Sequence, residues 1–146
     1  MKEAYLLMRD AGLKLTPRRQ AIIAMFSDSR VQLSPQEVQE RLKCQFIRCG
    51  LPGVYRNLEA LADCGVLFRV VGFGRERSYA LCCCSQRDGV HHHHHVICIS
   101  CGLVGQVESC AYQEGVVIEG FRVVSHVLQL RGICASCSSR ETEASG

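Results

Sequence analysis

The sequence predicts an α+β fold in two parts: a helical N-terminal part that ends in a β-hairpin, and a C-terminal part that contains metal ligands. Three observations predict it. Capped helical segments and two short β-prone runs fill the first 80 residues. Two Cys-x-x-Cys pairs lie beyond them. Residues 1–80 hold 13 basic against 8 acidic side chains, whereas residues 81–146 hold 4 against 6. A basic part favours a polyanionic partner.

Three helices are predicted in order from their caps and periodicity. Residues 2–10 have apolar side chains at helical spacing and stop before a glycine. Thr16 and Ser34 each precede a proline, the combination typical of an N-cap followed by the first helical residue. Glu37, three residues after Ser34, completes a capping-box pattern.

The segment "LPGVYRNLEALADCGVLFRV" predicts a further helix, opened by Pro52 and closed by Gly65. Its apolar face is formed by Val54, Leu58 and Leu61. The same periodicity directs three polar side chains away from the core: Tyr55, Arg56 and Asn57. The first turns of a recognition helix contact base edges, and these residue types are suitable for such contacts.

The run "VLFRVVGFGRERSYAL" predicts a hairpin with a basic tip that contains Arg75 and Arg77. Helices followed by a basic hairpin indicate a winged helix-turn-helix domain. Lys14, Arg18 and Arg19 are positioned to meet phosphates or to enter a minor groove. The alternative is a small helical domain whose arginines only face solvent.

Two Cys-x-x-Cys units, Cys98 with Cys101 and Cys134 with Cys137, are separated by 32 residues. Each unit can form a tight knuckle that directs two thiolates at one ion, and two knuckles complete a tetrahedral four-cysteine zinc site. Such a closed site contributes directly to folding. Free, buried or redox-active cysteines are the alternative interpretation.

Five histidines precede the first knuckle in "GVHHHHHVICISCG". A run of this kind resembles an expression tag, but it lies inside the chain. On a strand, His91, His93 and His95 face one side, and His92 and His94 face the other. One run can therefore contribute to two separate ions, with partners available in Cys82, His126 and the pair Gln113-Glu114.

Several classes of protein are disfavoured by the sequence. It has no apolar run of about 18–20 residues to span a bilayer and no signal-peptide pattern, so a cytoplasmic location is expected. Eleven cysteines in a reducing compartment favour metal binding or redox chemistry over a disulfide scaffold. A zinc hydrolase usually needs a carboxylate base beside an open zinc position, and no H-E-x-x-H motif is present. We therefore expect no enzyme activity, no small-molecule substrate and no membrane partner.

Four motifs in order, "AGLKLTPRR", "GLPGVYRNLEALADCGVLFRV", "HHHHHVICISCG" and "GICASC", resemble the ferric uptake regulator family over roughly residues 5–138. The resemblance implies a homodimeric, metal-sensing transcriptional repressor that binds a double-stranded DNA operator. It implies a winged-helix domain over residues 1–81, a hinge over residues 82–92 and an α/β dimerisation domain with the zinc site over residues 93–138. The polar residues 139–146 are predicted to be a disordered tail.

Departures from the family pattern indicate which metal is sensed. His94 and Gln32 stand where iron-sensing members have Asp and His, and Gln106 stands where peroxide-sensing relatives have Asp. Cys82 matches a hinge ligand of the zinc uptake regulators, to which the chain is most similar. Thiolate and imidazole ligands favour Zn2+ over Fe2+. Iron or peroxide sensing, with Fe2+ or Mn2+ at the regulatory site, and a zinc-ribbon interaction module without DNA binding are the alternatives.

Carried over by position, the hinge sensor site takes Cys82, His93 and His95. Phe68 stands at the wing position that often supplies the fourth ligand in the family. Cys84, a water and His91 are the alternatives for that ligand.

A second site takes His92, His94, Glu114 and His126. Glu114 is matched only by allowing a shift, and His126 is equally well explained as a buried structural histidine. Cys83 and Cys84 are more often spectators than ligands at such positions. Four other cysteines are expected to be small apolar fillers: Cys44, Cys49, Cys64 and Cys110.

Overall fold

The computed structural model describes residues 2–72, 77–82, 93–107, 110, 112 and 115–144, with side chains described up to residue 140. The chain divides into two compact units, Met1–Gln86 and Arg87–Gly146, called here the N-terminal and the C-terminal unit. This division lies within residues 82–92, the segment that the sequence predicts to be a hinge.

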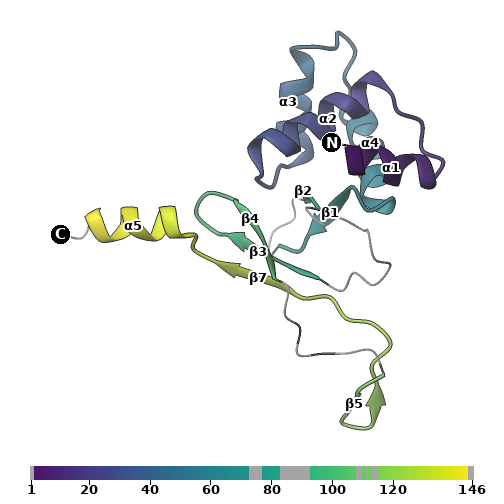
Figure 1. Cartoon of the computed structure of the whole chain (residues 1–146). Helices are drawn as coiled ribbons and strands as arrows, with labels where there is room; N and C mark the ends of the chain where they lie inside the picture. Colours follow the sequence, from purple (N-terminus) through teal and green to yellow (C-terminus); the bar gives the residue numbers. More distant parts are fainter. Residues whose placement is uncertain are drawn as a thin grey trace. The chain divides into compact units, whose positions relative to one another are not determined.

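The N-terminal unit contains four helices and a two-stranded sheet, in the order expected of a winged helix (Figure 1). Its elements are α1 (Lys2–Asp10), α2 (Pro17–Ser29), α3 (Pro35–Lys43), α4 (Leu51–Asp63), β1 (Leu67–Val70) and β2 (Ser78–Leu81). The two strands pair antiparallel, with Leu67 opposite Leu81 and Val70 opposite Ser78. The predicted helices and hairpin strands are therefore confirmed, and α4 begins one residue before Pro52.

Both predicted helix caps are present. The Thr16 side chain accepts a hydrogen bond from the Arg19 amide at 3.3 Å. Ser34 and Glu37 form a reciprocal capping box, since the Ser34 amide donates to Glu37 Oε2 at 2.7 Å and the Glu37 amide donates to Ser34 Oγ at 3.3 Å. These bonds satisfy helix-terminal amides that have no partner within the helix, and they fix where α2 and α3 begin.

The apolar face of α4 lies in the core of the N-terminal unit. Val54, Leu58 and Leu61 are at most 1% exposed and pack with residues of α1, α2, α3 and the two strands. Because that face points inward, Arg56 lies on the exposed side of the same helix. The core therefore orients α4 so that its polar first turns can contact a partner.

Glu59 of α4 joins the helix to the two strands that follow it. Arg69 of β1 donates to Glu59 and Asp63, the latter at 2.6 Å, and the Tyr79 hydroxyl of β2 donates to Glu59. The Arg69 bond, followed by the Tyr79 bond, lowers the pKa of the Glu59 carboxyl. Burial, followed by the Glu59 carboxylate, raises the pKa of Tyr79 to about 12. The ionised carboxylate thus holds the hairpin against α4.

Replacing Glu59 by glutamine is expected to lower the free energy of unfolding of the N-terminal unit by about 1 kcal/mol, a value reduced for solvent screening of these partly exposed groups. Because folding lowers the carboxyl pKa, this stabilisation is fully present above the ordinary value of 4.5 and is lost as pH falls through the lowered value. Urea unfolding of both proteins at neutral and acid pH measures it. Glu40→Gln, at the exposed α3 ion pair with Lys43, is the control. Equal stability of Glu59→Gln and the unchanged protein at neutral pH would contradict the expectation.

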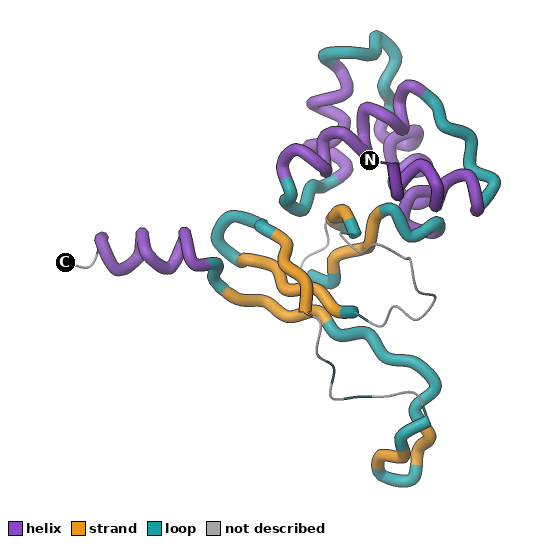
Figure 2. Tube along the Cα trace, in the orientation of Figure 1, coloured by secondary structure: helices purple, strands orange, loops and turns teal. Residues whose placement is uncertain are grey.

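The C-terminal unit is built on a three-stranded sheet of order β4-β3-β7 (Figure 2). Its elements are β3 (His94–Cys98), β4 (Val104–Val107), β5 (Val117–Ile118), β6 (Phe121–Arg122), β7 (Gln129–Gly132) and α5 (Ala135–Ala144). Strand β3 pairs antiparallel with β4 and parallel with β7. The central strand carries both a histidine ligand candidate and the first knuckle cysteine.

Helix α5 differs from the disordered tail expected at residues 139–146, because it continues to Ala144. The second knuckle provides its first turn, in which the Cys137 and Ser138 amides donate to the Cys134 carbonyl oxygen. Nucleation is the costly step of helix formation, and residues 135–144 contain neither Pro nor Gly to stop propagation. Among the described residues, no helix is long and apolar enough to cross a membrane.

Candidate metal centres and nucleic-acid surface

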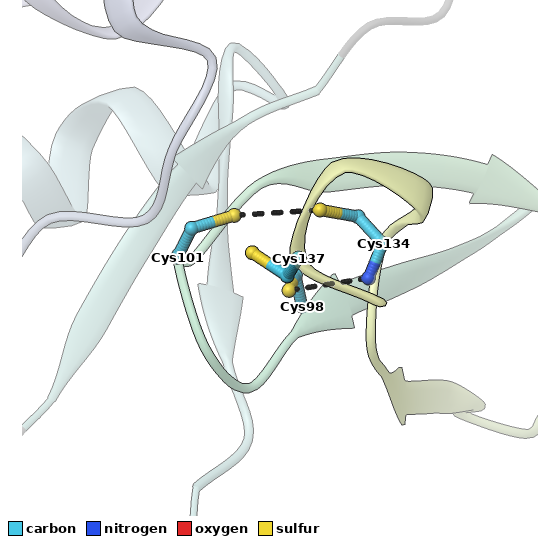
Figure 3. A group of neighbouring side chains, drawn as sticks. All are labelled: Cys98, Cys101, Cys134 and Cys137. Atoms are coloured by element: carbon cyan, nitrogen blue, oxygen red, sulfur yellow. Dashed lines mark hydrogen bonds between the residues drawn. The ribbon is translucent and has the colours of Figure 1, made fainter. Parts of the chain in front are cut away.

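Four cysteine sulfurs converge at one end of the C-terminal sheet (Figure 3). Cys98 ends β3, and Cys101 follows in a turn closed by the Gly102 amide, which donates to the Cys98 carbonyl oxygen. The register places Cys98 beside Gly132, so Cys134 emerges two residues later at the same end of the sheet. Parallel pairing of β3 with β7 is therefore what brings the two knuckles together.

The spacing of these sulfurs fits a tetrahedral zinc ion. All four lie within 4.8 Å of one another, and the Cys101 and Cys134 sulfurs are 3.7 Å apart. With Zn–S bonds of about 2.3 Å, two thiolates of a tetrahedral site are separated by about 3.8 Å. A four-thiolate donor set is one that structural zinc occupies. The four cysteines predicted from the sequence are thus gathered in one cluster.

Hydrogen bonds and burial shift the pKa values of the cysteines in this cluster in different directions. The Cys134 amide donates to Cys98 Sγ at 3.3 Å, and this bond is the main cause that lowers the pKa of Cys98 to about 6. The Ser100 hydroxyl lowers the pKa of Cys137. The Leu103 amide lowers the pKa of Cys101, but neighbouring thiols and burial outweigh it and raise the pKa to about 11. Four adjacent thiolates repel one another, and a divalent cation removes that repulsion.

A second cluster lies at the other end of β3 and consists of His94, Cys110 and His126, called here the His94 cluster. The Nε2 atoms of the two histidines are 3.2 Å apart, and Cys110 Sγ is 3.1 Å from His126 Nε2. The expectation that Cys110 is only an apolar filler is therefore wrong, because its sulfur contacts His126 Nε2 and accepts a hydrogen bond from the Tyr112 amide at 3.3 Å. Sequence reasoning overlooked it because it stands outside any Cys-x-x-Cys pair.

The predicted hinge ligands belong to different units: Cys82 to the N-terminal unit, and His93 and His95 to the C-terminal unit. Cys82 is half-buried directly after β2, and its amide donates to the Val66 carbonyl oxygen at 3.1 Å. His93 and His95 lie on the same side of the strand, with ring centroids 4.9 Å apart and planes nearly perpendicular. Three predicted site residues lie outside the described residues: Arg75, His92 and Glu114. So do Cys84 and His91, the two side chains considered as the fourth hinge ligand.

Several predicted DNA contacts meet where α2 begins. Arg19 donates to Asn57 Oδ1 at 3.0 Å and to the Lys14 carbonyl oxygen at 2.5 Å, which links α2 to α4. Asn57 in turn donates to the Gly53 carbonyl oxygen at 2.8 Å. Arg18 lies 5.3 Å from the Phe46 ring centroid. The Asn57 amide therefore orients the Arg19 guanidinium, whereas the sequence predicts Asn57 only as a direct contact.

On α4, Arg56 is exposed and Tyr55 is half-buried. Arg77 directly precedes β2, and its guanidinium lies 3.4 Å from Glu59 Oε1. A surface pocket of about 400 Å³ lies beside the start of α2 and the first turns of α4. It is lined by Thr16, Pro17, Arg18, Arg19, Phe46 and Asn57. Cationic and amide side chains around an open surface are the groups that bind phosphates and base edges.

The model of the ferric uptake regulator family matches residues 10–131. The chain belongs to the ferric uptake regulator family. The peroxide operon regulator of Bacillus subtilis (strain 168) is 27% identical over 149 aligned positions, which cover 97% of this chain and 95% of that protein. A zinc uptake regulator solved in complex with zinc and DNA is 26% identical with a TM-score of 0.74, covering 97% of this chain and 94% of that one.

A ferric uptake regulator from Francisella tularensis, solved with iron, is 29% identical with a TM-score of 0.57, covering 87% of this chain and 96% of that one. As a member of the ferric uptake regulator family, the chain is a metal-responsive transcriptional regulator with a winged helix and a metal-binding C-terminal part. These relatives are named for peroxide, zinc and iron, so their names leave the metal sensed by this chain to be inferred from its own ligands.

Proposed function

We propose that this family member is a zinc-sensing repressor that acts in the cytoplasm and controls zinc uptake genes. The supporting observation is the chemistry of the two clusters in the C-terminal unit, which combine thiols and imidazoles. Sulfur and imidazole ligands suit Zn2+, whereas carboxylates and water suit Mn2+ better. The four-cysteine cluster would hold a permanent structural zinc, with Cys98, Cys101, Cys134 and Cys137 as ligands.

The sensor ion in this proposal is bound by Cys82, His93 and His95. Cys82 directly follows β2 and His93 directly precedes β3, so an ion bound to both ends would constrain the connection over residues 83–92. Zinc would then favour the arrangement of the two units that binds DNA. A ligand biases such an equilibrium only by its differential affinity for the two states, typically about 1–3 kcal/mol per linked event.

A second regulatory ion is proposed at His94 and His126, with His92 and Glu114 as the further ligands that the family resemblance implies. The distance of 3.2 Å between the two imidazole nitrogens supports the part of this site that the structure describes.

A homodimer is proposed from the apolar surface of the C-terminal unit. Phe121 is 77% exposed and Val127 is 82% exposed, and Val117 and Val124 are exposed near them in sequence. An apolar surface of this kind marks a protein interface more often than free solvent contact. The interface would place two recognition helices on successive major grooves of one operator.

Metal-dependent DNA binding tests the proposed function. The probe is a duplex selected from random sequence with the zinc-loaded protein, and binding is measured anaerobically before and after mild chelation. We expect one chelator-resistant zinc per chain, loss of DNA binding after chelation, and recovery with Zn2+ but not with Fe2+ or Mn2+. Recovery only with Fe2+ or Mn2+ would replace the zinc assignment by iron or peroxide sensing. Absence of salt-sensitive duplex binding would favour an interaction module without a DNA role.

A further inference from the structure

We propose that Cys110 is a metal ligand and that His94, Cys110 and His126 together bind a zinc ion within the C-terminal unit. This inference rests on the proposed metal-sensing function, but it assigns to the second site a thiolate that neither the sequence motifs nor the family resemblance provides. The site needs no residue of the N-terminal unit, so it can be filled independently of Cys82.

The separations within the His94 cluster are those of ligands around one ion. Two imidazole nitrogens bound to tetrahedral zinc lie about 3.4 Å apart, and a nitrogen and a thiolate sulfur lie about 3.6 Å apart. The corresponding distances here are 3.2 Å and 3.1 Å. For these two pairs, zinc binding therefore requires shifts of at most about 0.5 Å. The third pair, His94 and Cys110, has its ligand atoms within 4.8 Å of each other. In place of His92 and Glu114, a water would complete the tetrahedron, as in zinc sites with three protein ligands.

Strand pairing explains why three residues distant in sequence meet here. His94 begins β3 opposite Val107, so Cys110, three residues after Val107, follows β4 at the same end of the sheet. Gln129 pairs with His95, so His126, three residues earlier, approaches that end along β7. His94 is only 4% exposed, which keeps its ring fixed in the sheet. The framework of the cluster is therefore set by backbone pairing.

Hydrogen bonds alone explain the cluster less well than a metal does. A neutral imidazole nitrogen has either one proton or one in-plane lone pair, yet His126 Nε2 lies within contact of both His94 Nε2 and Cys110 Sγ. A cation accepts all three lone pairs at once. The Tyr112 amide donates to Cys110 Sγ at 3.3 Å, the same kind of bond that the Cys134 amide makes to Cys98 in the four-cysteine cluster.

Binding would change the protonation of one group. In its thiol form, Cys110 can donate to the Tyr112 carbonyl oxygen, 3.1 Å away. When a metal binds, the thiol proton passes to solvent and the sulfur lone pair forms the metal bond. A thiolate in the ligand set favours Zn2+ or Co2+ over Mn2+. The second site would therefore discriminate against hard cations through Cys110.

Cobalt titration of the full chain in a Cys82→Ser background tests the assignment, because that background removes the hinge thiol. The protein first receives its chelator-resistant zinc, so that the four-cysteine cluster is filled, and zinc retention is measured throughout. We expect one further Co2+ per chain with a thiolate-to-cobalt charge-transfer absorption. In Cys82→Ser/Cys110→Ser this absorption should disappear and cobalt affinity should fall at least about tenfold, because even the loss of a hydrogen-bonding partner of a ligand costs about 10–100-fold in metal affinity.

Cys82→Ser/Cys44→Ser is the matched control, since Cys44 is an exposed thiol of the N-terminal unit, and it should behave like Cys82→Ser. If Cys110→Ser fails to fold, alkylation of the unchanged protein replaces it: zinc should protect Cys110 from iodoacetamide, as read by mass spectrometry. A charge-transfer band that persists without Cys110, or equal alkylation with and without zinc, would overturn the proposal. Neither outcome depends on DNA binding, so failure here leaves the proposed function to its own test.

Discussion

Cys98→Ser is expected to unfold the C-terminal unit while the N-terminal unit stays folded. Among the described residues of the C-terminal unit, the buried apolar side chains are Ile97, Cys98 and Cys137, a very small core. Structural zinc contributes about 10–16 kcal/mol of apparent binding free energy in small zinc domains. A whole domain has a free energy of unfolding of only about 5–15 kcal/mol, so weaker zinc binding would remove most of the stability of this unit. The N-terminal core, by contrast, contains none of these four cysteines.

Zinc content and limited proteolysis measure this effect. The variant should lose its chelator-resistant zinc and become cleavable within residues 93–144, while residues 2–72 remain protected. Cys44→Ser removes an exposed thiol in the N-terminal unit and should retain both the zinc and the protection. A Cys98→Ser protein that kept its resistant zinc and its protease pattern would show that the four-cysteine cluster is not the structural site.

Cys82→Ser is expected to abolish the zinc dependence of DNA binding and to leave a folded protein with its structural zinc. Serine retains the size of the side chain but provides no thiolate, so the proposed sensor loses one of its three ligands. A linkage of about 1–3 kcal/mol corresponds to a gain in DNA affinity of about 5–150-fold on adding zinc, and this gain should vanish. The fold should survive because Cys82 is half-buried and contributes a backbone bond that serine can also make.

Operator affinity measured with and without zinc, at one salt concentration, checks this result. The control is Cys64→Ser, another half-buried cysteine of the N-terminal unit, whose sulfur lies 3.4 Å from the Leu61 carbonyl oxygen. That variant should keep the full response to zinc. An unchanged zinc response in Cys82→Ser would exclude Cys82 as a sensor ligand.

Local signals predicted the N-terminal unit well, since helix caps and periodicity act within a few residues. Thr16 and Ser34 cap the helices they were expected to cap, and the apolar residues of α4 are buried as their spacing requires. The four-cysteine cluster could also be predicted from the sequence, because both knuckles have a fixed internal spacing. The Glu59 network was not predicted, since it depends on the packing of a hairpin against a helix.

The second cluster could not be read from spacing because its ligands meet through strand register. Nothing local distinguishes Cys110 from other isolated cysteines, and only the pairing of β3 with β4 and β7 brings it to His94 and His126. Helix α5 was missed for a related reason. Its polar sequence has no apolar stripe, and its first turn is provided by the knuckle at Cys134.

Strand β3 carries candidate ligands of two different ions at its two ends, His94 and Cys98. Four residues at about 3.3 Å each separate these ends by about 13 Å. At that distance the two ions share no ligand, because the two clusters have no residue in common. The short strand thus allows one ion to be exchanged with the surroundings while the other remains bound, and a single small sheet can combine a permanent metal with a replaceable one.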